Sequence, residues 1–271
     1  MRRPFQLIVC LIATMATSLL ASSAQAQGIL WSLPDAGGWV RFEGDYRQTD
    51  YRPENNQGDL NLSWRQHLEI RSVGSQQAEY NGETVECRWI EIESTTGRAE
   101  GEIKSGPGGQ HIYKILVPES AVTGQSRDNN RIANEYLPIV KGYQKTGEDP
   151  VRPIESGVFQ AYPILALLRH YQDLTTAGGP QSLTVPAGTF EATQYEGTLV
   201  SESDTSRTTN KAQIYATNQV PFGLAKWSVQ IDKEQRASSD TRDGFKPHSQ
   251  IRLTMDAHEV GTGAQSKIIE K

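Results

Sequence analysis

The chain has 271 residues, of which 36% are hydrophobic and 22% are charged, and its formal net charge at pH 7 is −5. This length suffices to bury a substantial core, and apolar residues recur throughout, which excludes an intrinsically disordered chain. The acidic balance excludes a general nucleic-acid-binding protein, because neutralising phosphates requires a surplus of Lys and Arg.

Residues 1–26 have the features of a secretory signal peptide. Arg2 and Arg3 form a positive n-region, residues 5–20 are mainly apolar, and Ala24-Gln25-Ala26 is a small-x-small cleavage pattern. A retained membrane anchor is the alternative, but the apolar segment is shorter than the ~20 residues that span a bilayer. Cleavage after Ala26 leaves 25 basic and 32 acidic residues, a net charge of −7. We therefore expect a soluble periplasmic or secreted protein with no stable membrane span.

The predicted mature chain keeps one cysteine, Cys87, so it cannot form an internal disulfide. Cys87 alternates with Val85 and Trp89 along a predicted strand, which places the three side chains on one face. This pattern favours a buried structural thiol over a reactive one.

Period-two alternation of apolar and polar residues predicts β-strands from residue 39 onward. In the clearest run, 60–70, Trp64 and Leu68 alternate with Arg65 and Glu69, which is typical of an antiparallel sheet with one wet face. Turn residues such as Asn81-Gly82 and Pro186-Ala187-Gly188 separate the runs. The predicted strands are 39–46, 60–71, 85–93, 111–117, 181–185, 190–200, 211–217, 226–232 and 250–260.

The middle of the chain has a different pattern. Apolar residues at three- and four-residue spacing predict a helix over 163–174, begun by Pro163. A second stretch, 131–145, is also helical in pattern, but its Pro138 and Gly142 predict a short or broken helix.

These helices would form an insertion at 118–180 that covers one face of the sheet. Predicted strands on both sides of the insertion favour one α+β domain over two modules. The fold prediction is a single mainly antiparallel-β domain at 27–260, a curved sheet or half-barrel with a central helical segment across it. A flexible tail is expected at 261–271.

The sequence lacks the common signatures of enzymes and metal sites. It has no Gly-x-Ser-x-Gly elbow, no phosphate-binding Walker loop and no zinc-binding pair of cysteines. The histidines, at 67, 111, 170, 248 and 258, are scattered without ligand spacing. We therefore expect a non-catalytic protein that needs no cofactor and no metal. A hydrolase whose site is assembled by folding from scattered His and carboxylates is the alternative.

Glu91 and Glu93 share one face of a predicted strand, with Glu86 nearby. Such carboxylates can bind a cation or act as a general acid and base. Because Ile90 and Ile92 occupy the opposite face, we expect Glu91 and Glu93 to lie on the solvated side of the sheet, where strand charges protect edges.

Apolar residues on several predicted strands are candidates for a ligand-binding surface. They would form either a closed core or a groove for an acyl chain or hydrophobic peptide, sealed by the 163–174 helix. The candidate ligand-binding residues are Trp64, Leu68, Ile70, Trp227, Val229, Leu253 and Met255.

Two turn-containing stretches resemble segments of known periplasmic proteins. Residues 183–192 read Leu-Thr-Val-Pro-Ala-Gly-Thr-Phe-Glu-Ala, and residues 212–226 include Val-Pro-Phe-Gly before Leu-Ala-Lys. In this order the stretches resemble the LolA/LolB/RseB-like superfamily of periplasmic lipoprotein carriers and related exported families. The resemblance implies a curved antiparallel half-barrel with helices across its open side. It transfers no individual ligand-contacting residue.

The leading prediction is an exported, non-catalytic envelope protein that binds or carries an amphiphilic ligand or a lipoprotein on the apolar face of a curved sheet. Its partner would be a lipid, an acylated protein or another envelope protein. The alternative is a structural or interaction module with a closed core and an acidic contact face. An open or a filled apolar face distinguishes the two.

Overall fold

The computed structural model describes residues 28–98, 108–122, 137–154, 166–169, 171 and 174–269. The predicted signal peptide lies outside these residues. The strands are β1 (Trp39–Asp50), β2 (Leu60–Tyr80), β3 (Glu83–Gly97), β4 (His111–Pro118), β5 (Lys141–Thr146), β6 (Arg152–Pro153), β7 (Thr175–Thr176), β8 (Gln181–Val185), β9 (Gly188–Glu202), β10 (Ser206–Ala216), β11 (Leu224–Gln235) and β12 (Lys246–Gly261). The helices are α1 (Glu119–Val122) and the 3-10 turns η1 (Pro221–Gly223) and η2 (Arg242–Gly244).

All strand pairs are antiparallel and belong to a 12-stranded sheet. The order along the sheet is β6-β5-β4-β3-β2-β1-β12-β11-β10-β9-β7, and β8 pairs with β9. The first long strand, β1, therefore lies between its sequence neighbour β2 and the last strand, β12. Because β1 pairs with β12, the strands before and after the 118–180 segment belong to one continuous sheet.

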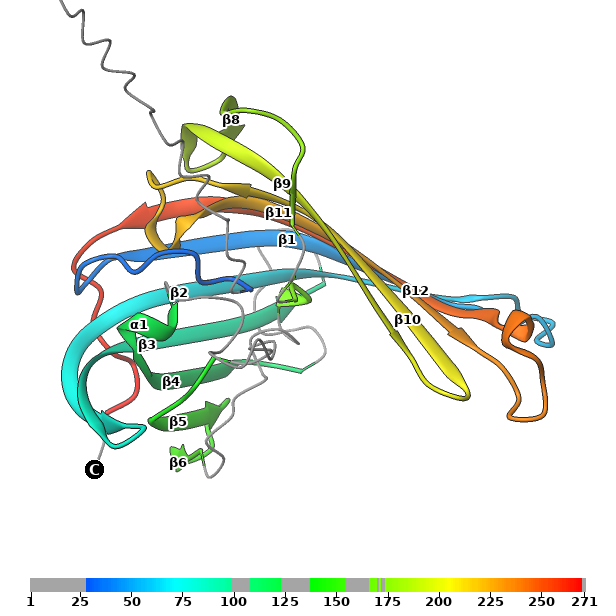
Figure 1. Cartoon of the computed structure of the whole chain (residues 1–271), viewed down its shortest axis with the longest axis horizontal. Coiled ribbons are helices and arrows are strands. Elements are labelled where there is room, and N and C mark those ends of the chain that lie inside the picture. The colour runs from blue at the N-terminus through cyan, green and yellow to red at the C-terminus, as the bar shows by residue number, and fades with distance from the viewer. Residues whose placement is uncertain are drawn as a thin grey trace, which may run out of the picture.

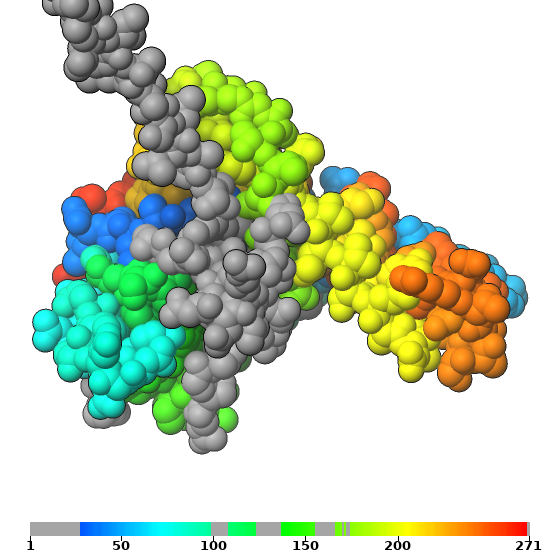
Figure 2. Space-filling model, in the orientation of Figure 1, coloured from blue at the N-terminus to red at the C-terminus, as the bar shows by residue number. Residues whose placement is uncertain are grey.

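The sheet is open and strongly curved (Figure 1). Strands β2 to β6 curl around the lower part of the view, whereas β9 to β12 and the ends of β1 and β2 run out together to the right. We call this projection the arm and define it as residues 47–63, 198–211 and 230–252. Figure 2 shows the arm as a narrow extension from a wider body.

Alternate residues of the strands fill the inner face of the sheet. Phe42, Leu68, Trp227 and Met255 are fully buried in one cluster with Ile29 and other residues of the preceding segment. The rings of Phe42 and Trp227 meet edge to face with centroids 4.6 Å apart. The chain's own segments therefore cover the inner face of the body.

The predicted strands are confirmed, and most are longer than expected. The Asn81-Gly82 turn joins β2 to β3 with both residues at positive φ, 54° and 81°, the geometry of a type I′ hairpin turn. Pro186-Ala187 likewise joins β8 to β9, with Val185 opposite Gly188. Turn chemistry and alternation thus identified these hairpins correctly.

The predicted 163–174 helix is wrong over its described residues. Only Ala166 is helical, and Leu167 has a φ of 54°, which ends the helix there. The indole N–H of Trp227 donates to the Ala166 carbonyl at 3.2 Å, and the Asn210 amide donates to the Leu167 carbonyl at 3.2 Å. Side chains of the sheet therefore satisfy carbonyls that a helix would have satisfied internally. The segment still covers the sheet, as predicted, because its apolar side chains are buried.

The predicted 131–145 helix is also wrong where the structure describes it. Residues 141–145 belong to β5, which pairs with β4, and residues 131–136 lie outside the described part. A Cβ at Gly142 would lie 2.9 Å from a methyl carbon of Ile154, so the strand packs closely there. The described parts of the 118–180 segment thus contribute mainly short strands and irregular cover to the sheet.

Cys87 occupies a small second cluster on the outer face of the sheet, with Trp89 and Leu116. Its thiol is free and fully buried, as alternation with Val85 and Trp89 predicted. Burial raises the pKa of the Cys87 thiol, which favours the unreactive protonated form.

Gly44 lies in β1 where the chain approaches β12 most closely. An added Cβ would lie 1.9 Å from the Thr254 carbonyl oxygen and 2.5 Å from the Met255 sulfur. We expect Gly44→Ala to lower the free energy of unfolding by about 3 kcal/mol, because backbone and core must both shift. Urea denaturation measures the loss. Gly178→Ala is the matched control, since its Cβ would meet no atom within 4 Å, and an equal loss there would contradict the explanation.

Candidate functional site

The structure brings the predicted ligand-binding residues together on the inner face, and it buries nearly all of them. Those that are almost inaccessible to solvent are Leu68, Ile70, Trp227, Val229, Leu253 and Met255. They contact one another and the covering segments within a single core cluster. In the body, therefore, the predicted apolar face is occupied by the protein itself.

Trp64 is the exception among these candidates, because it is only half-buried. Its ring stacks on Tyr46 of the neighbouring strand, with centroids 3.9 Å apart and an angle of 12° between the planes. Leu62, two residues earlier on the same face, is 37% exposed. As predicted from parity, Arg65 points to the other face, where it binds Asp45 at 2.8 Å.

A hollow of about 620 Å³ lies beside Trp64, and we call it the Trp64 hollow. It forms where β3 ends, since Gly97 is the last residue of β3 and pairs with Arg65, whereas β2 extends back to Leu60. Its lining combines the apolar Trp64, Tyr46 and Leu62 with polar and charged residues, among them Asn61, Thr49 and Arg47. An apolar wall next to such polar groups suits an amphiphilic molecule.

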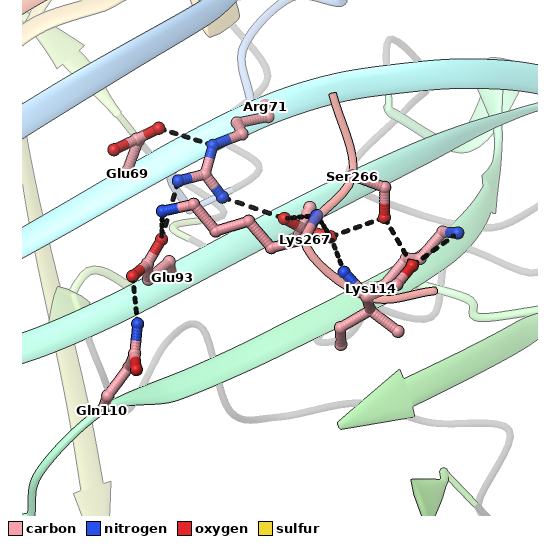
Figure 3. A network of polar contacts seen from close by, with 9 residues as sticks. Glu69, Arg71, Glu93, Gln110, Lys114, Ser266 and Lys267 are labelled. Atoms are coloured by element: carbon pink, nitrogen blue, oxygen red, sulfur yellow. Dashed lines mark hydrogen bonds and ion pairs between the residues drawn. The ribbon is translucent and has the colours of Figure 1, made fainter. Parts of the chain in front are cut away.

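Glu91 and Glu93 do not lie on a solvated face, contrary to expectation. Glu91 is fully buried and Glu93 nearly so, and both bind the buried Arg71 of β2. The Arg71 guanidinium donates to Glu91 at 2.9 Å, to Glu93 at 2.7 Å and to Glu69 at 2.5 Å. Figure 3 shows Arg71 between Glu69 and Glu93.

The C-terminal segment completes this network, so the predicted flexible tail is wrong over its described residues. The Ser266 hydroxyl and the Lys267 and Ile268 amides donate to the Glu91 carboxylate at distances between 2.8 and 3.1 Å. The Lys267 ammonium binds Glu93 at 2.5 Å (Figure 3). Burial explains the correction, because a carboxylate removed from water needs several donors, and the tail supplies them.

The electrostatics of the network keep Glu93 ionised. Burial alone would raise the pKa of the Glu93 carboxyl, but hydrogen bonds from Lys267 and Arg71 outweigh burial and hold it below its usual range. Gln110 donates a further hydrogen bond to Glu93. Because both carboxylates are fully engaged by fixed donors, the arrangement stabilises the fold and leaves no free acid–base pair.

A second polar cluster lies on the same face, around Glu43 of β1. The Nδ1 atoms of His67 and His258 each lie 3.6 Å from the same Glu43 oxygen. Burial lowers the pKa of the His67 imidazole, although the Glu43 carboxylate opposes this, and the lower pKa favours the neutral ring. Within the described residues no group of three His, Cys, Asp or Glu side chains is placed to hold a metal ion.

Sequence reasoning missed both polar clusters because alternation shows which face a residue occupies but not what covers that face. The contact between Ile268 and Glu91 joins residues 177 positions apart. The one sequence signal for the first cluster was that Arg71, Glu91 and Glu93 each stand next to apolar residues predicted to be buried. Alternation alone gave no reason to connect it with the C-terminus.

No helix in the described ranges is long and apolar enough to cross a membrane. No protein-family model and no curated protein sequence matches the chain. Solved structures show distant similarity. A candidate lipoprotein from Parabacteroides distasonis is 12% identical, covering 84% of this chain and 97% of its own, with a TM-score of 0.33.

A candidate exported protein with a YmcC-like fold from Bacteroides fragilis is 9% identical over 86% of this chain and 99% of its own, with a TM-score of 0.32. DynF, from the dynemicin biosynthesis pathway of Micromonospora chersina, is 10% identical over 86% of this chain and 85% of its own, with a TM-score of 0.23. None of these three descriptions names the LolA/LolB/RseB-like superfamily, so that resemblance stays a prediction. The function has to be inferred from the chain's own residues.

Docking of the tail predicts opposite outcomes for two adjacent isoleucines. Ile268 is 1% exposed and Ile269 is 79% exposed. We expect Ile268→Ala to lower the free energy of unfolding by about 2–3 kcal/mol and Ile269→Ala to change it by less than about 0.5 kcal/mol. Chemical denaturation distinguishes the two, and equal small effects would show that the tail is not docked in solution.

The ion pair between Glu93 and Lys267 predicts a loss of stability in acid. The folded-state pKa of Glu93 is depressed, so its contribution is present above the unfolded-state pKa and is lost as pH falls through the folded-state value. We expect Lys267→Ala to reduce the fall in melting temperature between pH 7 and acid pH. The control is Lys246→Ala, an exposed lysine on the arm. An unchanged acid profile in Lys267→Ala would contradict the assignment.

Proposed function

We propose that this protein is an exported, non-catalytic binding protein of the cell envelope that holds an amphiphilic ligand in the Trp64 hollow. The observation that carries the proposal is the contrast between Trp64 and the other predicted ligand-binding residues. Those residues are sealed in the core, whereas Trp64 borders a hollow of about 620 Å³ that has both apolar and polar walls. Export follows from the signal peptide predicted at residues 1–26.

The ligand class follows from the lining of the hollow. The stacked rings of Tyr46 and Trp64, together with Leu62, offer an apolar surface for a short alkyl segment. Arg98, an exposed residue of the same lining, can bind an anionic headgroup. A lipid or the acyl group of an acylated protein has this composition.

A non-catalytic role is supported by the state of the candidate acid–base residues. Glu91 and Glu93 are held by Arg71, Lys267 and the tail. His67 and His258 share a single carboxylate, and neither lines the Trp64 hollow. A hydrolase would need an accessible histidine next to a carboxylate and a substrate-sized cleft.

The second candidate function is a structural or interaction module with a closed core. It is favoured by one specific observation, the filling of the inner face by residues 29–33 and by the described residues of the later covering segment, 166–168, Tyr171 and Leu174. The two functions differ in whether the purified protein binds a small amphiphile.

We expect the full chain to bind 11-(dansylamino)undecanoic acid saturably, with an increase in dansyl emission on titration. Trp64→Ala should weaken binding about tenfold, which corresponds to ~1.4 kcal/mol, whereas Trp64→Phe should retain most of the affinity because it keeps a stacked ring. Val200→Ala, on an exposed residue outside the hollow, is the control.

Stability separates loss of binding from loss of fold in this test. Because Trp64 is half-buried, Trp64→Ala should cost about 1–2 kcal/mol, less than the ~3–5 kcal/mol of a fully buried tryptophan. Absence of saturable binding by the wild-type protein would reject the proposal and favour the interaction module.

A further inference from the structure

The outer face of the arm carries a row of residues that runs across neighbouring strands. The strand registers place Lys211 of β10 opposite Gln230 of β11, Gln230 opposite Arg252 of β12, and Arg252 opposite Arg47 of β1. We call these four residues the cationic row. Their parity is opposite to that of Val229 and the other core residues, so all four side chains lie on the outer face.

The sheet is hollowed along most of this row. A depression of about 450 Å³ is lined by Lys211, Gln230 and Arg252 together with hydroxyl-bearing neighbours such as Ser228 and Thr254. Arg47 lines the adjoining Trp64 hollow, so the row connects the two depressions. The cations therefore lie in a recessed surface that a chain-like ligand can follow.

Arg47 and Arg252 form a like-charged pair with no compensation inside the described structure. They are direct cross-strand neighbours, and both are exposed. Like charges in this position destabilise a sheet. Neither guanidinium takes part in an ion pair or hydrogen bond with another residue of the described ranges.

The nearby carboxylates are already engaged by other residues. Asp45 binds Arg65 at 2.8 Å. Asp232 accepts hydrogen bonds from Gln230 at 3.0 Å and from Gln250 at 2.8 Å, and Lys211 lies 3.9 Å from it. Glu196, which lines the same depression, accepts hydrogen bonds from Gln213 at 3.2 Å and from Gln194 at 3.4 Å. These acids are thus engaged by other residues, and the two arginines stay available to an external anion.

The spacing of the row specifies an extended ligand. Neighbouring strands lie ~4.8 Å apart, so Arg47 and Arg252 are separated by about one strand spacing and Lys211 by about two more. A single small anion reaches only the arginine pair, whereas a linear polyanion lying across the strands meets all three cations. Guanidinium groups bind carboxylate, sulfate and phosphate oxygens in bidentate fashion.

The uncharged neighbours of the row favour a sugar chain. Amide and hydroxyl side chains surround the cations, and they can hydrogen-bond the hydroxyl groups of a glycan; beside Gln230 of the row itself they include Thr198, Gln213, Ser228 and Thr254. Among the described residues that line this depression none is aromatic, so it lacks the base stacking on which single-stranded nucleic-acid binding relies. We propose that the cationic row on the outer face of the arm binds an acidic polysaccharide. This proposal does not rest on the proposed function. The two share Arg47, which lines the Trp64 hollow, but Lys211, Gln230 and Arg252 line the separate depression.

Polygalacturonate is a suitable probe because it carries one carboxylate per sugar, and neutral dextran is its uncharged counterpart. We expect the full chain to bind labelled polygalacturonate in fluorescence polarisation at 50 mM NaCl and to lose affinity at 300 mM NaCl through screening. It should not bind dextran. Binding to dextran, or no binding to polygalacturonate at low salt, would overturn the proposal.

The double variant Arg47→Gln/Arg252→Gln tests the row directly. We expect it to weaken polygalacturonate binding about tenfold or more, since two charge-assisted contacts are lost. The matched control is Arg52→Gln/Arg152→Gln, which removes the same charge from exposed positions outside the row and should bind as the wild type does. Equal losses in both double variants would indicate only a net-charge effect and would reject the site.

Two further readouts separate the proposal from misfolding and from the other hollow. Removing the like-charged pair should leave the melting temperature unchanged or raise it, and a clear decrease would show that the arginines serve the fold. Trp64→Ala should leave polygalacturonate binding unchanged. A single-stranded oligonucleotide that bound more tightly than polygalacturonate would overturn the choice of a sugar chain.

Discussion

A sheet with one apolar face has to be covered, and the covering chain must find partners for its own backbone polar groups. This constraint explains much of the architecture. The carbonyls of Ala166 and Leu167 accept hydrogen bonds from Trp227 and Asn210 of the sheet. The Phe222 carbonyl in η1 accepts one from the Trp31 amide at 2.9 Å. Irregular segments can therefore lie on the core without becoming helices, because the sheet supplies the donors.

On the outer face the same requirement applies to charged side chains: a charge that is covered needs hydrogen-bond or ion-pair partners. Glu91 can be buried because Arg71, the Ser266 hydroxyl and the amides of Lys267 and Ile268 donate hydrogen bonds to it. The body thus has an apolar face covered by irregular chain and a charged face partly covered by the C-terminal segment. What is left open is the arm and its junction with the body, and both inferred sites lie at that junction: Trp64 is next to the arm in β2, and Arg47, Lys211, Gln230 and Arg252 lie at its base.

The sequence predicted the strands well and the covering segments poorly, and the difference has a physical cause. Alternation in β1, β2 and β12 reports a local property, the side of the sheet that each residue faces. Apolar spacing in 163–174 also reported burial correctly, but the same spacing suits any segment that lies on a core. What decides between helix and irregular chain here is Trp227 and Asn210, which are distant in sequence. Likewise, alternation placed the candidate ligand-binding residues on one face correctly, but the filling of that face by the protein's own residues depends on long-range contacts.

The position of β12 has a consequence for the order in which this chain can fold. As synthesis proceeds from the N-terminus, β1 can pair with β2 early, but its other edge stays open until the final strand is made. The hydrogen bonds that Glu91 accepts from Ser266 and Ile268 can form only later, because these donors lie 175 and 177 residues further along the chain. Contacts of such separation are slow to form, since the entropy of closing the loop is lost before the contact compensates for it. The native sheet and its buried carboxylate therefore form only after β12 and the residues around Ile268 have been synthesised.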